Sequence, residues 1–461
     1  MGVFANTRVI ELLKEAWMLA IETLSWMEMR KLGERLALAR TVKQLNIDNA
    51  DSARLAHRLV SETVRRRNFI DRFIDITLKP HELGEFDLGI QAFLRLYVCQ
   101  TRLTKNWAKA DIKEAEHIIK LARSILGWKT LEQVEPFLGV LLTEKPDLVF
   151  ENVGDERRVG LQTFHPAWFV RYCFKLFGRS GTIAMLEADK QESPTYVRVN
   201  TLKLDESNIL ERLAKESINV EKVEGFKYVY RVIGSKQPMI RTASHKEGLF
   251  YIQDKSSCFV VEVADPKPDM TALDVCAAPG AKTTYLAQLM QNKGVIYSLD
   301  YSRRRMQVWK NEVVNMDTKI AEPIIADACF QLPLDLQADV LILDPPCTST
   351  GTFRKSPSEK WRLTPNSIGR MAEIQWRMLN SCADSVKPGG ILIYSTNSLT
   401  IEENEMQIER FLKWHADFSL EQIAPSAGSQ GLRGLEKCRR FYPHMHECNG
   451  SFVAKLVKNR I

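Results

Sequence analysis

The alternation of apolar and polar positions divides the chain into regions of different pattern. In the first third, apolar residues recur at the spacing of amphipathic helices. The segments that show this spacing are Leu12–Leu24, Leu36–Ala39, Ala53–Val64, Phe69–Ile74 and Gly89–Tyr97. We therefore expect residues 1–150 to form an α-helical domain. From residue 266 to residue 461, short apolar runs alternate with helical patterns, which predicts a doubly wound α/β domain.

The region between them, residues 151–265, mixes both patterns. Val197 and Val199 alternate with Arg198, as in a half-exposed strand. Residues 209–214 have helical spacing, and residues 228–233 have the composition of a second strand. We expect a small α+β domain here. The charged stretch 146–158 before it is expected to be a linker.

Composition narrows the class of protein. The chain has 461 residues, too many for one hydrophobic core, with 45% hydrophobic and 26% charged residues. A net charge of +7 is compatible with a nucleic-acid partner. No apolar run approaches the length of a membrane span, and the N-terminus lacks a signal-peptide pattern. Nine cysteines without metal-type spacing favour reduced thiols, so we expect a cytoplasmic protein with no bound metal.

One stretch of the last domain has the pattern of a ligand-binding crevice. Residues 271–276 are an apolar strand, and a turn through Gly280 leads into a helix. Such a turn places unpaired N–H groups at the carboxyl end of a parallel sheet. Asp300 ends the next apolar strand, where an acid accepts hydrogen bonds from ribose hydroxyls. The pattern GxGxxG is absent, which argues against an NAD enzyme and leaves another nucleoside cofactor.

A second loop carries a thiol. Residues 340–343 are a fully apolar strand, followed by Asp344-Pro345-Pro346-Cys347. The two prolines restrict the loop, so Asp344 and Cys347 are held in place. A thiol after this turn indicates methylation at carbon-5 of a pyrimidine. That carbon is a weak nucleophile until a thiolate adds to carbon-6, and an acid at ring nitrogen 3 assists the addition.

These motifs resemble those of a known family. Cys-Ala-Ala-Pro-Gly-Ala-Lys-Thr, residues 276–283, resembles the cofactor loop of the Sun/Fmu (RsmB/Nop-type) family of RNA cytosine-5 methyltransferases, which use S-adenosylmethionine. H-P-x-W, R-V-N-T-L-K, Y-I-Q-D-K-S-S and E-E-N-E follow the family in order, and the resemblance covers residues 160–458. It implies a Rossmann-like methyltransferase domain at 266–461.

The resemblance also implies the residues that bind the cofactor. Asp327 follows a third strand, where the family's acid faces the adenine amino group. The family has a second glycine where this chain has Ala281. The expected cofactor-binding residues are Cys276, Ala277, Ala278, Pro279, Gly280, Ala281, Lys282, Asp300, Arg305, Asp327 and Asp344.

The chain departs from the family at one catalytic position. Residues 389–398 match G-G-x-L-x-Y-S-T-C-S, but the Cys that attacks the base in the family is Asn397 here. An amide cannot add to carbon-6. The chain is then a naturally inactive RNA-binding homologue, an engineered knock-out, or an enzyme in which Cys347 attacks instead. The candidate catalytic residues are Cys347, Asp344 and the substituted Asn397.

The resemblance implies RNA as the partner of a monomeric protein. The helical domain is similar, loosely, to a NusB-like RNA-binding domain, and residues 151–265 to the family's small RNA-contacting domain. Candidate RNA contacts are Arg65, Arg66, Arg67, Arg198, Asn200, Lys203, Arg354 and Lys360. For the three successive arginines, an exposed helix face without a ligand is the alternative. Ribosomal RNA is the expected substrate and transfer RNA the alternative. Two extra domains argue against a small-molecule methyltransferase.

Overall fold

The computed structural model describes residues 2–103, 111–333, 336–424 and 426–460. The chain divides into two compact units. The first, the helical unit, contains residues 1–191 together with 355–362. The second, the catalytic unit, contains residues 192–354 and 363–461. The helical unit therefore continues past the boundary near residue 150 that the sequence predicts.

The helical unit confirms the predicted α-helical class. Its helices are α1 (Gly2–Arg30), α2 (Glu34–Leu45), α3 (Ala50–Arg65), α4 (Arg67–Thr77), α5 (Leu88–Val98), α6 (Ile112–Leu126), α7 (Trp128–Leu131), α8 (Glu135–Thr143), α9 (Asp155–Thr163), α10 (Ala167–Ala188) and α16 (Glu359–Arg362). Short helical turns lie at Leu83–Glu85, Cys99–Leu103 and Pro146–Phe150. The expected linker 146–158 is thus helical over most of its length.

Apolar side chains at helical spacing form the core of this unit. Phe69 and Phe73 of α4 and Phe93 and Tyr97 of α5 are buried together. The Tyr97 hydroxyl donates to the carbonyl oxygen of Leu138 in α8, 3.1 Å away, so the buried phenol keeps a partner.

Helix α16 completes the helical unit from a distant part of the sequence. Lys360 is 1% exposed, and its Nζ donates to the carbonyl oxygens of Arg65 and Phe164, at 3.2 and 2.7 Å. Trp361 Nε1 donates to the carbonyl oxygen of Val64 at 2.6 Å. Burial lowers the pKa of the Lys360 ammonium to about 7. The segment that follows the Cys347 loop is therefore an integral part of the helical unit.

The catalytic unit begins with a small antiparallel sheet of order β2-β3-β1-β4. Its elements are β1 (Thr195–Val199), α11 (Glu206–Lys215), β2 (Ile218–Lys222), β3 (Val229–Ser235), the short turn Met239–Arg241, α12 (Ala243–Lys246) and β4 (Phe250–Ile252). This confirms the α+β pattern of the middle region. Strand β1 is central, paired with β3 and β4, so Arg198 is buried rather than on a half-exposed face.

The larger sheet has the order β11-β12-β13-β9-β8-β5-β6-β7, and β10 also pairs with β13. Strands β7, β6, β5, β8 and β9 are parallel neighbours, and β13 is antiparallel to β9. The elements are α13 (Lys255–Ala264), β5 (Thr271–Val275), α14 (Ala281–Leu289), β6 (Val295–Asp300), α15 (Arg303–Asn315), β7 (Ala321–Ile325), β8 (Ala338–Leu343), α17 (Pro365–Cys382), the turn Ala383–Ser385, β9 (Val386–Thr396), α18 (Glu405–Trp414), β10 (Phe418–Leu420), β11 (Ser429–Gln430), β12 (Arg439–Phe441), α19 (Pro443–His446) and β13 (Ser451–Lys458).

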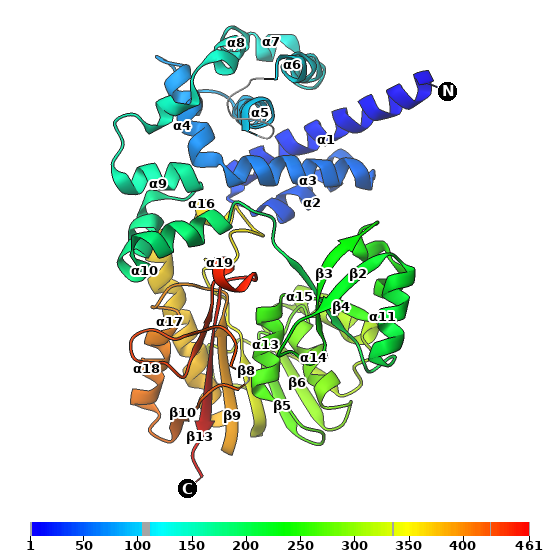
Figure 1. Cartoon of the computed structure of the whole chain (residues 1–461), viewed down its shortest axis with the longest axis vertical. Helices are drawn as coiled ribbons and strands as arrows, with labels where there is room; N and C mark the ends of the chain where they lie inside the picture. The colour runs from blue at the N-terminus through cyan, green and yellow to red at the C-terminus, as the bar shows by residue number, and fades with distance from the viewer. Residues whose placement is uncertain (1, 104–110, 334–335, 425, 461) are drawn as a thin grey trace. The chain divides into compact units, whose positions relative to one another are not determined.

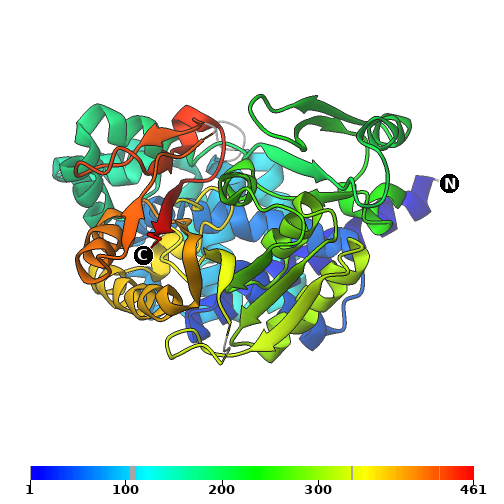
Figure 2. The same cartoon turned by 90° about the horizontal axis from the view of Figure 1, so that it is seen from below.

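Helices cover both faces of this sheet, as Figures 1 and 2 show. On one face, Leu341 and Leu392 pack with Leu379 of α17 and Phe411 of α18. On the other face, Val340 and Ile393 pack with residues of α13 and α14. Successive residues of a strand point to opposite faces, so each buried strand needs an uninterrupted apolar run. The predicted doubly wound, Rossmann-like class is confirmed. None of the described helices is long and apolar enough to cross a membrane.

Candidate functional site

The candidate residues gather at one edge of the larger sheet. Asp327, Asp300, the loop 276–280, Asp344 and Asn397 follow, or lie at, the carboxyl ends of β7, β6, β5, β8 and β9. This is also the order of the strands in the sheet. In an open parallel sheet, ligands bind outside the carboxyl ends of the strands. The sheet therefore brings the predicted cofactor and catalytic residues into one row.

The loop after β5 has the backbone that the sequence suggests. Gly280 has φ of +115°, a conformation that side chains disfavour. A Cβ there would lie 3.3 Å from Trp309 Cδ1 of α15, so the position is also crowded. Ala281 is the first residue of α14, where helical backbone accepts a side chain. The departure from the family's second glycine is thus compatible with this loop.

Two acids extend the site toward β6 and β7. Asp300 accepts from the Ser302 N–H at 3.0 Å, and Arg305 Nη1 lies 3.0 Å from the other oxygen of this carboxylate. The Arg305 guanidinium also donates to the carbonyl oxygen of Ala278 in the cofactor loop. Asp327 accepts from the Cys329 N–H at 2.9 Å. Strands β6 and β7 are parallel neighbours, so Asp300 and Asp327 follow adjacent strands at the carboxyl edge of the sheet.

Behind the loop, Asp274 is buried in β5. Its Oδ2 accepts from the Thr283 hydroxyl at 2.6 Å, and Trp309 Nε1 donates to the same hydroxyl at 3.0 Å. The other oxygen, Oδ1, has no hydrogen-bond partner among the described residues. Burial raises the pKa of Asp274 to about 6. A buried polar oxygen without a partner is unfavourable by about 1–3 kcal/mol, so the loop is suited to a ligand or water that donates to it.

An ion pair borders a small cavity in this unit. The Lys282 ammonium donates to Asp344, whose other oxygen accepts from the Ser395 hydroxyl at 3.2 Å. Burial alone would lower the pKa of Lys282, but the Asp344 carboxylate raises it. The cavity is lined by Ser256, Ser257, Val260, Lys282, Asp344, Ser395, Thr396, Asn397 and Ser451. Asn397 therefore faces the same space as the ion pair.

Cys347 lies next to this cavity and is partly exposed. Its Sγ is 3.8 Å from the Ser349 hydroxyl, and the backbone N–H groups of Ser349 and Asn397 favour the thiolate. Burial, with the carboxylates of Glu403 and Asp344, outweighs them and raises the pKa of Cys347 to about 12. Cys347 is not among the cavity's lining residues in the described part of the chain. The thiol is close to position 397 but is protonated at neutral pH.

Three expected RNA contacts of the small sheet have protein partners. The Arg198 guanidinium is fully buried and donates to Gln253 at 3.1 Å and Thr284 at 2.8 Å. Asn200 is buried and donates to the carbonyl oxygens of Gly248 and Met316. Lys203 is exposed, and its Nζ donates to the carbonyl oxygen of Glu247 at 2.6 Å. Arg198 and Asn200 therefore hold the protein together in this structure, and their position does not support the RNA contacts expected from the sequence.

The remaining basic candidates also have hydrogen-bond or ion-pair partners within the protein. Arg65 is buried and donates to the carbonyl oxygen of Asp189 at 2.7 Å. Arg66 pairs with Glu62, and Arg67 with Glu28 at 2.7 Å. In the catalytic unit, the Arg354 guanidinium donates to the carbonyl oxygen of Glu192.

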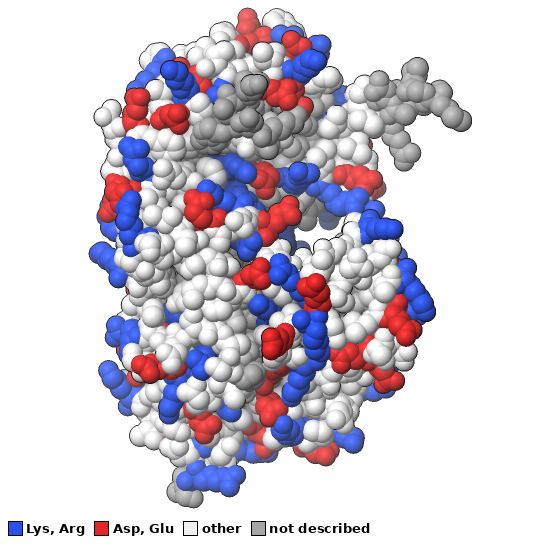
Figure 3. Space-filling view, in the orientation of Figure 1, with Lys and Arg blue, Asp and Glu red and all other residues white. Residues whose placement is uncertain are grey.

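Among the basic candidates, Lys360 and Arg65 are only 1% and 9% exposed, which leaves too little surface to bind phosphate. Arg66, Arg67, Lys203 and Arg354 retain some exposure. On the face in Figure 3, Lys and Arg side chains are interspersed with Asp and Glu.

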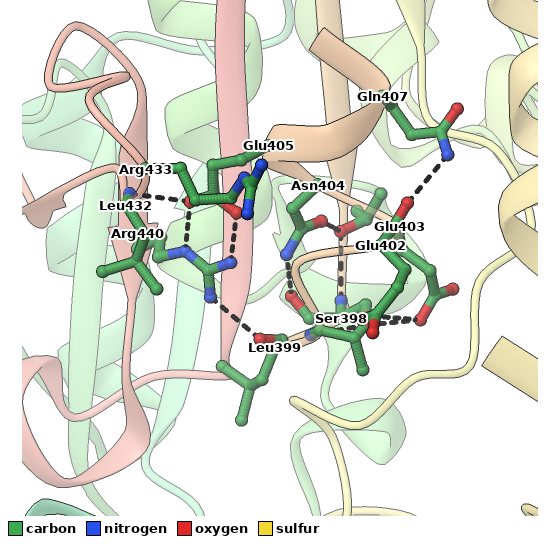
Figure 4. Close-up of polar contacts among 12 residues, drawn as sticks. Ser398, Leu399, Glu402, Glu403, Asn404, Glu405, Gln407, Leu432, Arg433 and Arg440 are labelled. Carbon is green, nitrogen blue, oxygen red and sulfur yellow. Dashed lines mark hydrogen bonds and ion pairs between the residues drawn. The ribbon is translucent and has the colours of Figure 1, made fainter. Parts of the chain in front are cut away.

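Sequence reasoning missed a buried polar cluster beside the Cys347 loop. Glu403, Asn404 and Glu405 are each 0% exposed, although acidic residues at the start of a helix are mostly exposed. Glu405 forms an ion pair with Arg440, which is also fully buried. Figure 4 shows these contacts. The motif E-E-N-E did not indicate this burial, because three successive polar residues at a strand-to-helix turn are rarely all buried.

Comparison with known proteins agrees with this geometry. Residues 261–457 match the family described as 16S rRNA methyltransferase RsmB/F, and residues 165–232 match the ferredoxin-like domain of the same proteins. A probable ribosomal RNA small subunit methyltransferase B of Bacillus subtilis is 30% identical over 451 residues, which cover 95% of this chain and 98% of the relative. The chain belongs to the RsmB/F (Sun/Fmu) family of RNA methyltransferases.

Two further relatives extend the comparison. A tRNA (cytosine(72)-C(5))-methyltransferase of Pyrococcus horikoshii is 36% identical over 213 residues, which cover 46% of this chain and 53% of the relative. A crystal structure described as that of PH0851 superposes with a TM-score of 0.79 and 28% identity, covering 96% of this chain and 99% of that one. Family membership supports RNA cytosine-5 methylation with S-adenosylmethionine as the cofactor.

Proposed function

We propose that the protein transfers a methyl group to carbon-5 of a cytosine in ribosomal RNA, with Cys347 as the attacking thiol. The observation that carries the proposal is the position of Cys347 beside Asn397 and Asp344, where the carboxyl ends of β8 and β9 meet. S-adenosylmethionine supplies an electrophilic methyl sulfonium when bound. Asp300, Asp327 and the loop through Gly280 are the residues that would hold it.

The reaction then follows from the side chains present. The Cys347 thiolate adds to carbon-6, which places the displaced electron pair on carbon-5, and the Asp344 carboxylate holds the base by accepting from the amino group beside ring nitrogen 3. Carbon-5 takes the methyl group, so the sulfonium becomes a neutral thioether. A general base then removes the carbon-5 proton, and the electrons of that bond expel the Cys347 thiolate from carbon-6. Lys282 and Ser395 hold Asp344 in one orientation for this role. Cys347 does not line the cavity. For Cys347 to reach carbon-6, the cytosine must therefore lie nearer to β8 than it would for attack by a thiol at position 397.

Ribosomal RNA of the small subunit is the proposed substrate. The small-subunit relative aligns with 95% of the chain, including the helical unit, whereas the tRNA enzyme aligns with 46%. A substrate that needs the helical unit is thus favoured. We further propose that the protein acts as a monomer in the cytoplasm, where its free thiols remain reduced.

A second function is favoured by a specific observation. Asn397 lines the cavity at the position of the family's nucleophile, and burial keeps the Cys347 thiol protonated. A protein that binds the cofactor and RNA without transferring the methyl group would have this geometry.

One experiment separates the two functions. The purified full chain is incubated with radiolabelled S-adenosylmethionine and unmethylated 16S rRNA or tRNA, and bisulfite sequencing locates any 5-methylcytosine. Label in one cytosine of 16S rRNA supports the enzyme. Binding of both ligands without incorporation contradicts it and supports the non-catalytic binder.

A further inference from the structure

The loops that carry Cys347 and Asn397 are bonded directly, by the Gly351 N–H to the Asn397 carbonyl oxygen at 2.9 Å, and also through one buried carboxylate. Glu403 is 0% exposed and lies in the turn between β9 and α18. Its Oε1 accepts from the Thr348 N–H at 2.8 Å and from Gln375 Nε2 at 2.9 Å. Its Oε2 accepts from the hydroxyls of Thr348, Ser398 and Thr400. Both oxygens are thus saturated with donors.

These donors come from different parts of the chain. Thr348 follows Cys347 directly in the loop after β8, whereas Ser398 follows Asn397 directly in the loop after β9. Gln375 belongs to α17, and its Nε2 also donates to the carbonyl oxygen of Pro346 at 2.9 Å. Glu403 therefore bonds to the immediate neighbour of each catalytic candidate at once.

The backbone that carries Glu403 is itself fixed. The Tyr394 hydroxyl donates to the Glu403 carbonyl oxygen at 2.6 Å. The Asn404 side chain accepts from the Thr396 hydroxyl at 2.6 Å and donates to the Ser398 carbonyl oxygen at 2.8 Å. On the far side, Arg440 Nη1 donates to the Leu399 carbonyl oxygen at 2.9 Å (Figure 4). The loop after β9 therefore has little freedom to move relative to Glu403.

We propose that Glu403 is a positioning residue that holds Cys347 and residue 397 in register for attack on the base. The proposal rests on the proposed function. Misplacement of reacting groups by about 1 Å can lower a rate by about a hundredfold, so a rigid connection between two loops has catalytic value. A buried carboxylate with several donors is also hard to rearrange, because any donor left alone is desolvated without a partner.

The chain offers a matched pair of variants for the test. Thr348 and Thr400 are both buried, and each hydroxyl contacts Glu403 Oε2 and the Ser398 hydroxyl. The Thr348 contact crosses from the loop after β8 to the loop after β9, whereas the Thr400 contact stays within the second loop. Thr348→Val and Thr400→Val therefore remove similar hydroxyl hydrogen bonds, but only the first removes one that crosses between the loops; the Thr348 N–H bond to Glu403 remains in both.

The first measurement does not depend on activity. The folded full-length variants are treated with iodoacetamide, and the alkylation rate of Cys347 is followed by peptide mass spectrometry. We expect Thr348→Val to raise this rate at least tenfold and Thr400→Val to change it less than threefold, with melting temperatures that fall equally. Equal alkylation rates in the two variants would overturn the positioning role.

The second measurement uses single-turnover methyl transfer to 16S rRNA, in the parent or, if the parent is inactive, in the Asn397→Cys background. We expect Thr348→Val to lower the rate at least tenfold more than Thr400→Val, with the KM for RNA and for cofactor changed less than threefold. Glu403→Gln should lie between the parent and Glu403→Ala, because the surrounding hydroxyls can rotate to accept from an amide. A rise in KM with no fall in rate would overturn the proposal. If neither parent nor Asn397→Cys transfers methyl, the proposed function fails, and the alkylation rates alone decide the role of Glu403.

Discussion

The backbone N–H of Asn397 forms a hydrogen bond that stabilises the thiolate form of Cys347. The two catalytic candidates are therefore neighbours, at the ends of the adjacent parallel strands β8 and β9. Parallel strands lie about 5 Å apart, which is less than the width of a cytosine with its substituents. A base held between β8 and β9 can therefore be approached from either position. This relationship makes an exchange of nucleophile between the two loops a testable idea.

Any methyl transfer by the native chain should depend on Cys347. Cys347→Ala removes the thiol near the base, and we expect the rate of methyl transfer to fall at least a hundredfold. Asn397→Cys places a thiol on the wall of the cavity, and we expect the rate to rise. Methyl incorporation into 16S rRNA is measured for all three proteins under single-turnover conditions. Unchanged activity in Cys347→Ala would exclude Cys347 as the nucleophile.

The rate of the native protein should increase with pH. Burial raises the pKa of Cys347 to about 12, so the reactive thiolate is a small fraction at neutral pH. That fraction grows about tenfold for each pH unit below the pKa, and the single-turnover rate should follow it between pH 7 and pH 9. Circular dichroism at each pH confirms that the protein stays folded. A flat profile would indicate that thiolate formation does not limit the reaction.

Asp300 should contribute to cofactor affinity. Asp300→Asn keeps an oxygen for the Ser302 N–H but removes the charge and half of the acceptor capacity at the end of β6. We expect affinity for S-adenosylmethionine to fall by about 1–3 kcal/mol, measured by isothermal titration calorimetry. Asp317→Asn is the control, because Asp317 precedes β7 and lies at the opposite edge of the sheet. Equal affinities of the two variants for S-adenosylmethionine would contradict the assignment of Asp300 as a cofactor-binding residue.

Lys360 should make the stability of the protein depend on pH. Its folded pKa is about 7, below the 10.5 of a free lysine, so between these values the unfolded chain binds more protons than the folded one. The free energy of unfolding should then rise with pH across this window, by up to about 1.4 kcal/mol per pH unit.

This slope is measured by urea unfolding of the full chain at pH 7, 8 and 9. In Lys360→Met the contribution should be absent, while Lys355→Met, at an exposed position of the same segment, should keep it. If the free energy of unfolding rises with pH equally in the native protein and in Lys360→Met, the buried Lys360 ammonium is not the cause of the rise.

Strand patterns made the cofactor edge of the site predictable. Asp300, Asp327 and Asp344 each follow a short apolar run, and parallel topology brings such positions to one edge whatever the loops between them do. The partners of polar residues inside domains were not predictable in the same way. Arg198 looked like the exposed face of a strand because its acceptors, Gln253 and Thr284, are far away in the sequence.

The same limit applies to Glu403 and Lys360. A sequence shows the charge of a residue but not whether tertiary structure supplies enough partners to bury it. Glu403 is buried because five donors from three segments converge on it, and Lys360 because two carbonyl oxygens are left open in the helical unit. Both features depend on long-range packing, which local periodicity does not encode.

Helix α16 has a consequence for the order of events during synthesis. Domains generally fold as they leave the ribosome, N-terminal parts first. The helical unit cannot do so completely, because residues 355–362 belong to it and are translated more than 160 residues after Gln191. The ribosome must therefore make most of the parallel sheet, through the end of β8, before the first domain of the chain receives its last helix.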